Sequence, residues 1–160
     1  DYIISSNPDG WFAGSKDFTT KGLTNDSLEV NLLLEKIIIN KPIVLENIYY
    51  DLDKWNIRPD AAIELDKLIT ILNDNPKIVI ELGSHTDSRA PDSYNMSLSD
   101  RRAKSAADYI VKKGGIDSSR ITGKGYGETM LVNSCKNKVR CTEAEHQKNR
   151  RTEFIVKKVK

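Results

Sequence analysis

The chain has 160 residues, of which 38% are hydrophobic and 30% are charged, and its formal net charge at pH 7 is +2. This length is sufficient for one domain with a hydrophobic core and a smaller appendage, and the composition is that of a globular protein. The small net charge argues against a nucleic-acid-binding module, and apolar runs such as residues 37–39 are far too short to cross a bilayer.

Residues 1–41 are predicted to be the C-terminal part of a preceding β-rich unit, or a linker that leads into the main domain. Two polar segments that contain glycine, residues 7–10 and 19–22, are typical of turns. Four aliphatic residues then alternate with other positions and predict a strand: Leu28, Val30, Leu32 and Leu34. Pro42 interrupts this alternation, so we expect the main domain to comprise residues 42–160.

The main domain begins with a predicted strand, a helix and a second strand. Residues 43–50 are rich in β-branched and aromatic side chains, which indicates a strand. Pro59 suits the first turn of a helix. An apolar stripe at helical spacing follows it: Ala61, Leu65, Leu68, Ile69 and Leu72. Residues 78–82 predict a short buried strand, and a loop is expected over residues 85–95.

The second half of the domain continues this alternation. A helix is predicted over residues 97–113, where two consecutive glycines end it. Residues 121–126 and 152–156 are predicted strands, with a short helical piece over residues 143–149 between them. The order β-α-β-α-β-(α)-β predicts an α+β sandwich, with one mixed sheet and helices packed on one face.

Arg102 is an anomaly on the predicted second helix. It lies on the edge of an apolar face formed by Leu98, Ala103, Ala106, Ala107, Ile110 and Val111. A guanidinium beside a core is costly unless it is paired, and near a helix N-terminus its charge opposes the helix dipole. We therefore expect an anionic partner for Arg102. The candidate is Asp87, which follows the buried strand where the chain leaves the sheet.

Asp87 and Arg102 together suit a zwitterionic ligand. A carboxylate at a strand end and an arginine on the next helix can flank one shallow pocket. Asp87 would hold an ammonium group, and Arg102 would clamp a carboxylate with two parallel hydrogen bonds. On the pattern alone, a plain salt bridge between Asp87 and Arg102 accounts for the two residues equally well.

Other polar and aromatic residues give weaker signals. His85 is expected to be a hydrogen-bonding loop residue, because no nucleophile is placed to form a triad with it. Arg150 and Arg151 begin the last strand and are expected to cap the sheet or face solvent. Trp11 and Trp55 are expected to be packing residues rather than stacking platforms, because no aromatic series accompanies the basic residues.

Cys135 and Cys141 lie six positions apart in one polar segment. Two states compete for them, a local disulfide in an oxidising compartment and two free thiols. A zinc site would need more ligands than His146, which is the other candidate nearby. We expect the disulfide, because it would pin an otherwise long loop.

Several ordered blocks of the sequence resemble the OmpA-like C-terminal domain family. The family signature reads roughly GHTD, then YN, then LSxxRA, and the spacing from Asp87 to Arg102 agrees with it. The matching blocks lie at residues 50–54, 57–59, 83–103, 125–128 and 149–153. Two departures are an extra residue, Ser84, and Ala90 at a position where glycine is common. The segment over residues 135–141 resembles an insertion found in one branch of the family.

The resemblance implies non-covalent binding of peptidoglycan. Asp87 and Arg102 would hold the diaminopimelate of the stem peptide, whose free amino acid end is a zwitterion. Asn95 matches a family position that lines the same pocket, and Tyr50 and Asp53 match its rim on the first strand.

The implied role is a non-catalytic anchor between the cell wall and the outer membrane, on the periplasmic side of that membrane in a Gram-negative bacterium. Peptidoglycan and, through an upstream region, the outer membrane are the implied partners, with no cofactor, metal or nucleic acid. Because the first residue is Asp1 rather than Met, we interpret the chain as a mature or trimmed fragment. A peptidoglycan hydrolase is disfavoured, because neither a zinc ligand set nor an activated nucleophile is evident. The intact pair of Asp87 and Arg102 argues against a pure protein-interaction domain.

Overall fold

The computed structural model describes the chain except residues 24–26, 47, 49 and 51–53. Its main part is a four-stranded mixed sheet with the order β3–β6–β4–β5. The strands are β3 (Pro42–Leu45), β6 (Thr152–Val159), β4 (Ile78–His85) and β5 (Ile121–Gly127). β4 and β5 run parallel, whereas β6 runs antiparallel to both of its neighbours, β3 and β4.

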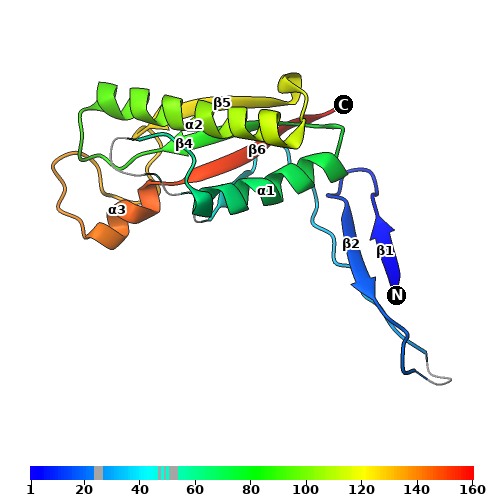
Figure 1. The fold of residues 1–160 in the computed structure, drawn as a ribbon. Helices are drawn as coiled ribbons and strands as arrows, with labels where there is room; N and C mark the ends of the chain where they lie inside the picture. Colours follow the sequence, from blue (N-terminus) through cyan, green and yellow to red (C-terminus); the bar gives the residue numbers. More distant parts are fainter. Residues whose placement is uncertain (24–26, 47, 49, 51–53) are drawn as a thin grey trace.

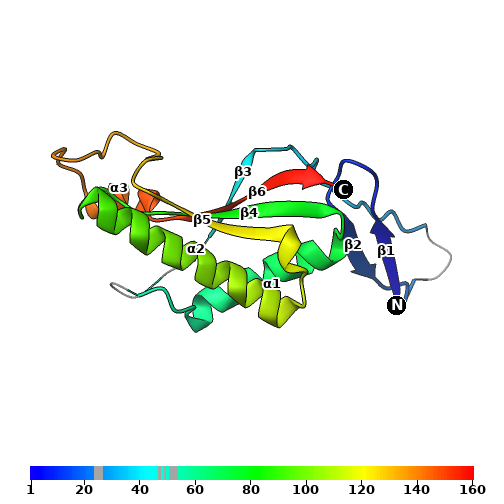
Figure 2. The same cartoon turned by 90° about the horizontal axis from the view of Figure 1, so that it is seen from above.

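Two long helices cover one face of this sheet. α1 (Pro59–Asp74) and α2 (Asp92–Gly114) lie on the same side of it in Figures 1 and 2. A short 3-10 turn, η1 (Ser118–Arg120), precedes β5, and α3 (Glu143–Asn149) lies at one end of the sheet. This arrangement confirms the predicted α+β fold. None of the helices in the described part of the chain has the length and apolar character needed to cross a membrane.

The apolar stripe predicted on α1 packs into the core. Four of its residues have 0% exposure: Ala61, Leu65, Leu68 and Leu72. They belong to one buried cluster with Ile80 and Leu82 of β4 and Ile110 of α2, and Ile69 packs against its edge. Burial of each large aliphatic side chain contributes about 1.5–3 kcal/mol. The core therefore joins both helices to the centre of the sheet.

Two glycines of β5 allow α2 to approach the sheet closely. A Cβ atom added at Gly125 would lie 2.2 Å from the backbone nitrogen of Asp100, and one at Gly123 would lie 2.5 Å from the carbonyl oxygen of Ala103. Both contacts are with helix backbone, so a side chain could be accommodated only if α2 moved. These glycines therefore fix the position of the helix that carries Arg102.

Both α2 and β4 are longer than predicted. α2 begins at Asp92 rather than at residue 97, and the acidic Asp92 in its first turn complements the helix dipole. Arg102 consequently lies in the middle of the helix, so the expectation that it opposes the dipole at an N-terminus is wrong. β4 extends to His85, whose N–H donates to the carbonyl of Arg151. In contrast, β3 ends at Leu45, well before residue 50.

The chain before residue 42 carries a separate two-stranded sheet, which, together with the described segments beside it, we call the appendage. β1 (Tyr2–Ser6) and β2 (Gly14–Phe18) pair as an antiparallel hairpin that projects from the end of the main domain opposite α3 (Figure 1). The appendage is attached to the main domain by a hydrogen bond from the N–H of Ala13 to the side chain of Asn75, 2.8 Å long. A second bond, 2.9 Å long, joins the N–H of Asn40 to the carbonyl of Val156. The domain boundary near residue 42 stays a prediction.

The strand predicted from the alternation of Leu28, Val30, Leu32 and Leu34 is wrong. These residues belong to no strand, and Lys36 makes only an isolated bridge to Trp11. The alternation is present in the burial, since Leu33 is 94% exposed between half-buried Leu32 and Leu34. Backbone pairing is limited to bonds such as that from the N–H of Phe12 to the carbonyl of Glu35, 2.8 Å long. The alternating side chains therefore pack here without continuous backbone hydrogen bonding to a second strand.

Replacement of Gly125 by alanine tests the close approach of α2. We expect G125A to lower the free energy of unfolding by about 1–3 kcal/mol, because the added methyl group forces the helix away from β5. T122A on the same strand should change it by less than about 0.5 kcal/mol, because Thr122 is exposed. Urea titration of both variants measures the difference, and equal stabilities would contradict the close contact.

Candidate functional site

A small cavity lies where β4, β6, α2 and the end of α3 meet. Its volume is about 100 Å³, and its lining includes three arginines, Arg102, Arg150 and Arg151, together with Tyr50 and His85. Arg102 comes from the middle of α2, whereas Arg150 and Arg151 connect α3 to β6. Because three cationic side chains converge on it, this cavity suits an anionic group.

Arg102 is held in place by the segment that precedes α1. Its Nε donates a hydrogen bond of 3.0 Å to the carbonyl of Lys54, and its guanidinium lies 4.8 Å from the centre of the Tyr50 ring. The hydroxyl of Tyr50 in turn donates to the backbone carbonyl of Arg102 at 3.3 Å. The structure therefore brings Arg102 and Tyr50, both predicted site residues, into contact, and their role in ligand binding stays a prediction. Asp53, which was predicted with them, lies outside the described residues.

Burial raises the pKa of Tyr50 to about 12, although the charge of Arg102 acts in the opposite direction. The hydroxyl is therefore protonated throughout the physiological pH range. It stays a hydrogen-bond donor and adds no negative charge that would repel an anion in the cavity.

Asp87 is buried and bonded to two arginines. Only 7% of the residue is exposed. Its Oδ2 accepts hydrogen bonds from the Nη2 of Arg89 at 2.7 Å and from the Nη1 of Arg150 at 2.5 Å, and its Oδ1 accepts one from the N–H of Arg89. Among the described residues, its ion-pair partners are thus Arg89 and Arg150, and a plain salt bridge to Arg102 is not formed. Arg150 links Asp87 to the cavity, which it also lines.

Glu143 completes this group of charges. Its carboxylate pairs with Arg89 at 2.8 Å and with Arg150 at 2.5 Å. Burial acts to raise the pKa of Asp87, but the hydrogen bonds from Arg89 and Arg150 outweigh it, so that pKa is lowered. Hydrogen bonds from the same two arginines lower the pKa of Glu143, and the bond from Arg150 has the larger effect. Two carboxylates and two guanidinium groups therefore form one alternating cluster, which we call the Asp87 cluster.

Asn95 supports the loop that carries Asp87. It is 2% exposed, and its side-chain amide donates to the carbonyls of Asp87 and Ala90, both at 3.0 Å, and to the carboxylate of Glu128. Asn95 therefore lies behind the loop, whereas the cavity lining comprises other residues. The extra Ser84 lies in β4, opposite Gly125 and Thr152, and the register between β4 and β5 shifts directly after it, because His85 pairs with Gly127.

Two predictions from single residues are corrected. Arg150 was expected to cap the sheet or face solvent, but its side chain is 26% exposed and bonds to Asp87. His85 was expected in a loop, but it ends β4, is 3% exposed, and stacks on Tyr126 with 5.1 Å between ring centres. Its Nε2 lies 3.2 Å from a carboxylate oxygen of Glu153. The two consecutive arginines just before a strand were the signal in the sequence that could have revealed the contact between Arg150 and Asp87.

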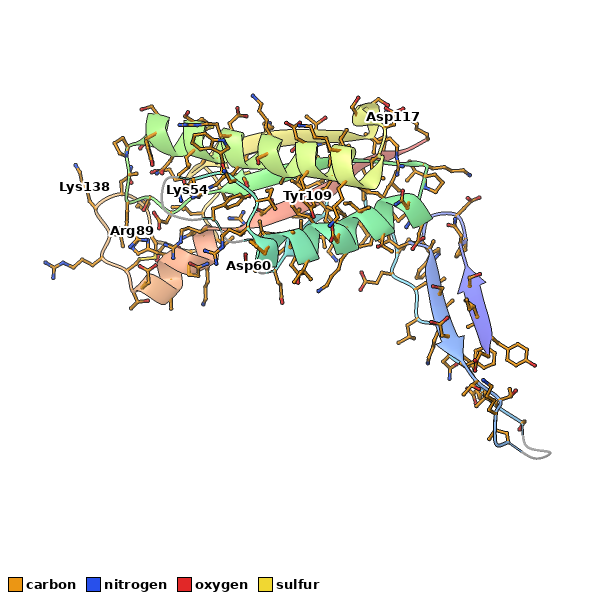
Figure 3. The ribbon with its side chains drawn as sticks, viewed as in Figure 1. Lys54, Asp60, Arg89, Tyr109, Asp117 and Lys138 are labelled. Atoms are coloured by element: carbon orange, nitrogen blue, oxygen red, sulfur yellow. A yellow bond between two sulfur atoms is a disulfide. The ribbon has the colours of Figure 1, made fainter. Side chains whose placement is uncertain are left out.

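The predicted disulfide between Cys135 and Cys141 is confirmed, with a sulfur–sulfur distance of 2.06 Å. It lies next to the loop of Asp87, because the hydroxyl of Ser88 donates a 2.6 Å hydrogen bond to the carbonyl of Cys135. Figure 3 shows Arg89 and Lys138, from the two adjoining segments, at the same end of the molecule. The disulfide therefore stabilises a loop that packs against the candidate site.

Replacement of Asp87 by asparagine tests the charge cluster. A carboxyl group whose pKa is lowered by folding stabilises the protein above its unfolded pKa, about 4, and this contribution is lost as the pH falls through the lower folded value. We expect D87N to lower the free energy of unfolding by about 1–3 kcal/mol at neutral pH, where Arg89 and Arg150 lose a charged partner. The difference from wild type should shrink at about pH 3. Urea titration at both pH values measures this, and a pH-independent difference would refute it.

Removal of the disulfide by the double change C135S/C141S should cost about 2 kcal/mol, the value for a short closed loop. The melting temperature of the wild type should fall when reductant is added, whereas that of the double variant should not respond. Thermal unfolding with and without reductant makes this comparison. Titratable thiols in the denatured, unreduced wild type would speak against the disulfide.

Comparisons with known proteins agree with this architecture. The model of the OmpA family matches residues 49–145. The photosystem I P700 chlorophyll a apoprotein A2 of Gloeobacter violaceus is 36% identical over 113 residues, which are 70% of this chain and 13% of that protein. Outer membrane porin F of Pseudomonas fluorescens is 36% identical over 110 residues, 69% of this chain and 32% of that protein. The chain thus spans less than a third of either relative.

A solved structure shares the fold. The peptidoglycan-associated lipoprotein from Burkholderia pseudomallei superimposes with a TM-score of 0.58 and 21% identity, over 68% of this chain and 86% of that one. At this identity the likeness concerns the fold alone. The family model, in contrast, matches more than half of the 160 residues. This chain belongs to the OmpA family.

Proposed function

We propose that this chain binds peptidoglycan non-covalently and that Arg102 and Asp87 hold the diaminopimelate of the stem peptide. The observation that carries the proposal is the small cavity that Arg102 lines together with Arg150 and Arg151. Membership of the OmpA family supports it, as does the similarity in fold to a lipoprotein named as peptidoglycan-associated.

Arg102 is the proposed clamp for the carboxylate of diaminopimelate. Its bond to Lys54 and its contact with the ring of Tyr50 limit the motion of the guanidinium, so less side-chain entropy is lost when the ligand binds. The planar guanidinium can donate two parallel hydrogen bonds to a carboxylate. Tyr50, Arg150 and Arg151 line the same cavity, where Arg150 also pairs with Asp87 and Glu143 and Arg151 pairs with Glu153.

Asp87 is the proposed acceptor for the ammonium group. Its Oδ2 bonds to both arginines, whereas the bond at Oδ1 comes from the N–H of Arg89. A carboxylate has about four acceptor positions, so Oδ1 can accept a further hydrogen bond. The two carboxylates and two guanidinium groups of the Asp87 cluster balance in charge, so the proposed contact is this further hydrogen bond from the ammonium group to Oδ1. Asn95, which holds the backbone of this loop, would act by positioning Asp87.

The proposed function is anchoring, without catalysis. Binding would connect the cell wall to the outer membrane, or to an outer-membrane protein, through residues upstream of the main domain. The name of the relative outer membrane porin F supports a place in the Gram-negative envelope, on the periplasmic side of the outer membrane. In the described part of the chain, the side chains that line the cavity supply hydrogen bonds and charge, which is what an anchor requires.

Replacement of Arg102 tests the clamp. We expect R102A to weaken binding of a diaminopimelate-containing stem peptide by at least about 30-fold, because truncation of one partner in a desolvated charged contact costs about 2–5 kcal/mol. R102K should also bind weakly, because lysine lacks the planar fork. R140A is the matched control, since Arg140 is an exposed arginine in the loop that the disulfide closes. Calorimetric titration and melting temperatures of the same samples give affinity and stability.

Two outcomes would contradict the proposal. The first is a folded R102A variant that binds the peptide as strongly as wild type. The second is time-dependent release of soluble muropeptides from purified sacculi by the pure chain, because an anchor should sediment with sacculi and leave them intact. A stem peptide with lysine in place of diaminopimelate lacks the side-chain carboxylate and should bind the wild type much more weakly.

A further inference from the structure

A second hollow lies along α2, next to the segment that leads into α1. Its volume is about 460 Å³. Trp55, Ile57 and Tyr109 supply its apolar lining, and Ser105, Asp108 and Lys112 are among its polar residues. Figure 3 places Tyr109 between α1 and α2. We call this hollow the Trp55 groove.

The two aromatic rings of the Trp55 groove are held in place. The guanidinium of Arg101 lies 4.5 Å from the centre of the indole of Trp55. The hydroxyl of Tyr109 donates to Asp66 at 3.0 Å and accepts from Lys113 at 2.8 Å. Trp55 packs against Arg101, as expected of a packing residue, and still stays 37% exposed. An exposed but immobilised ring is a preformed surface for stacking.

The polar side chains of the groove are available for a ligand. Ser105, Asp108 and Lys112 follow each other along one face of α2. Over the residues that the structure describes, their side chains make no hydrogen bond and no ion pair. Together they offer hydrogen-bond donors and acceptors, and one side chain of each charge sign. This combination suits a neutral ligand with many hydroxyl and amide groups better than a polyanion.

The Trp55 groove adjoins the cavity of Arg102. Arg101 lines the groove and Arg102 lines the cavity, so two consecutive residues of α2 serve the two sites. On the other chain segment, Lys54 accepts the hydrogen bond from Arg102, and Trp55 is the next residue. A ligand bound at Arg102 therefore brings any group attached to it close to Trp55.

We propose that the Trp55 groove binds the glycan backbone of peptidoglycan. This inference rests on the proposed function, in which the cavity holds the stem peptide. Trp55 stacks on the apolar face of an amino sugar, while Ser105, Asp108 and Lys112 bond to its hydroxyl and N-acetyl groups. Because glycan and peptide are covalently joined, binding of one raises the effective concentration of the other at the adjacent site.

The test compares two ligands, the free stem peptide and the same peptide attached to its disaccharide. The wild-type chain should bind the disaccharide-linked peptide about 10-fold more tightly, which corresponds to about 1.4 kcal/mol. W55A should bind the two ligands with equal affinity, and its affinity for the free peptide should equal that of the wild type. W55F should retain part of the preference for the disaccharide-linked peptide. D108A, an exposed change on α2, should reduce the advantage without loss of stability. W11A is the matched control, because Trp11 is 41% exposed and lies in the appendage.

The outcomes separate this inference from the function on which it rests. If the wild type binds both ligands equally, or if W55A and D108A keep the full advantage, the groove does not bind glycan. If the wild type binds neither ligand nor purified sacculi, the proposed function itself is wrong, and this inference falls with it. Melting temperatures of all variants exclude loss of folding as the cause.

Discussion

The carboxylate of Asp87 is buried at the end of β4, and a buried charge is tolerated only when it is paired. Arg89 comes from the same loop, but Arg150 lies 63 positions further along the chain. Their pairing fixes the end of α3 against the end of β4, and Glu143 continues the contact into the first turn of α3. The position of α3, and with it one wall of the cavity, follows from the need to neutralise Asp87.

A second constraint comes from the sheet itself. β5 approaches α2 through Gly123 and Gly125, so the helix backbone is positioned by contact with another backbone. This contact tolerates less adjustment than contacts between flexible side chains. Arg102 on α2 and Asp87 after β4 are therefore brought to the same end of the sheet by two independent sets of contacts, one ionic and one steric.

The sequence predicted the regular elements better than their interactions. The periodicity of Leu65, Leu68 and Leu72 identified α1, because burial of one helical face leaves a local pattern. The alternation around Leu33 suggested a strand, but a strand also needs a partner for its backbone, which a single segment does not reveal. Motif spacing predicted Arg102 and Tyr50 as site residues, and this role stays a prediction. The short spacing of Cys135 and Cys141 predicted the disulfide that the structure contains. The partners of Asp87 were missed, because the approach of Arg150 depends on the three-dimensional course of the chain between them.

In Figure 1 the appendage lies at the end of the main domain opposite α3, and the cavity is lined by Gln147 of α3 and by the two arginines that follow this helix. β3 follows the appendage and pairs antiparallel with β6 from Pro42 opposite Ile155 to Leu45 opposite Thr152. Tension between a ligand in the cavity and the appendage would therefore act along the strands and pull β3 lengthwise past β6. In this shear geometry the hydrogen bonds between the two strands share the load, instead of opening one after another as in a zipper. For the proposed anchor, the orientation of this short edge strand would give mechanical resistance in the direction of the pull.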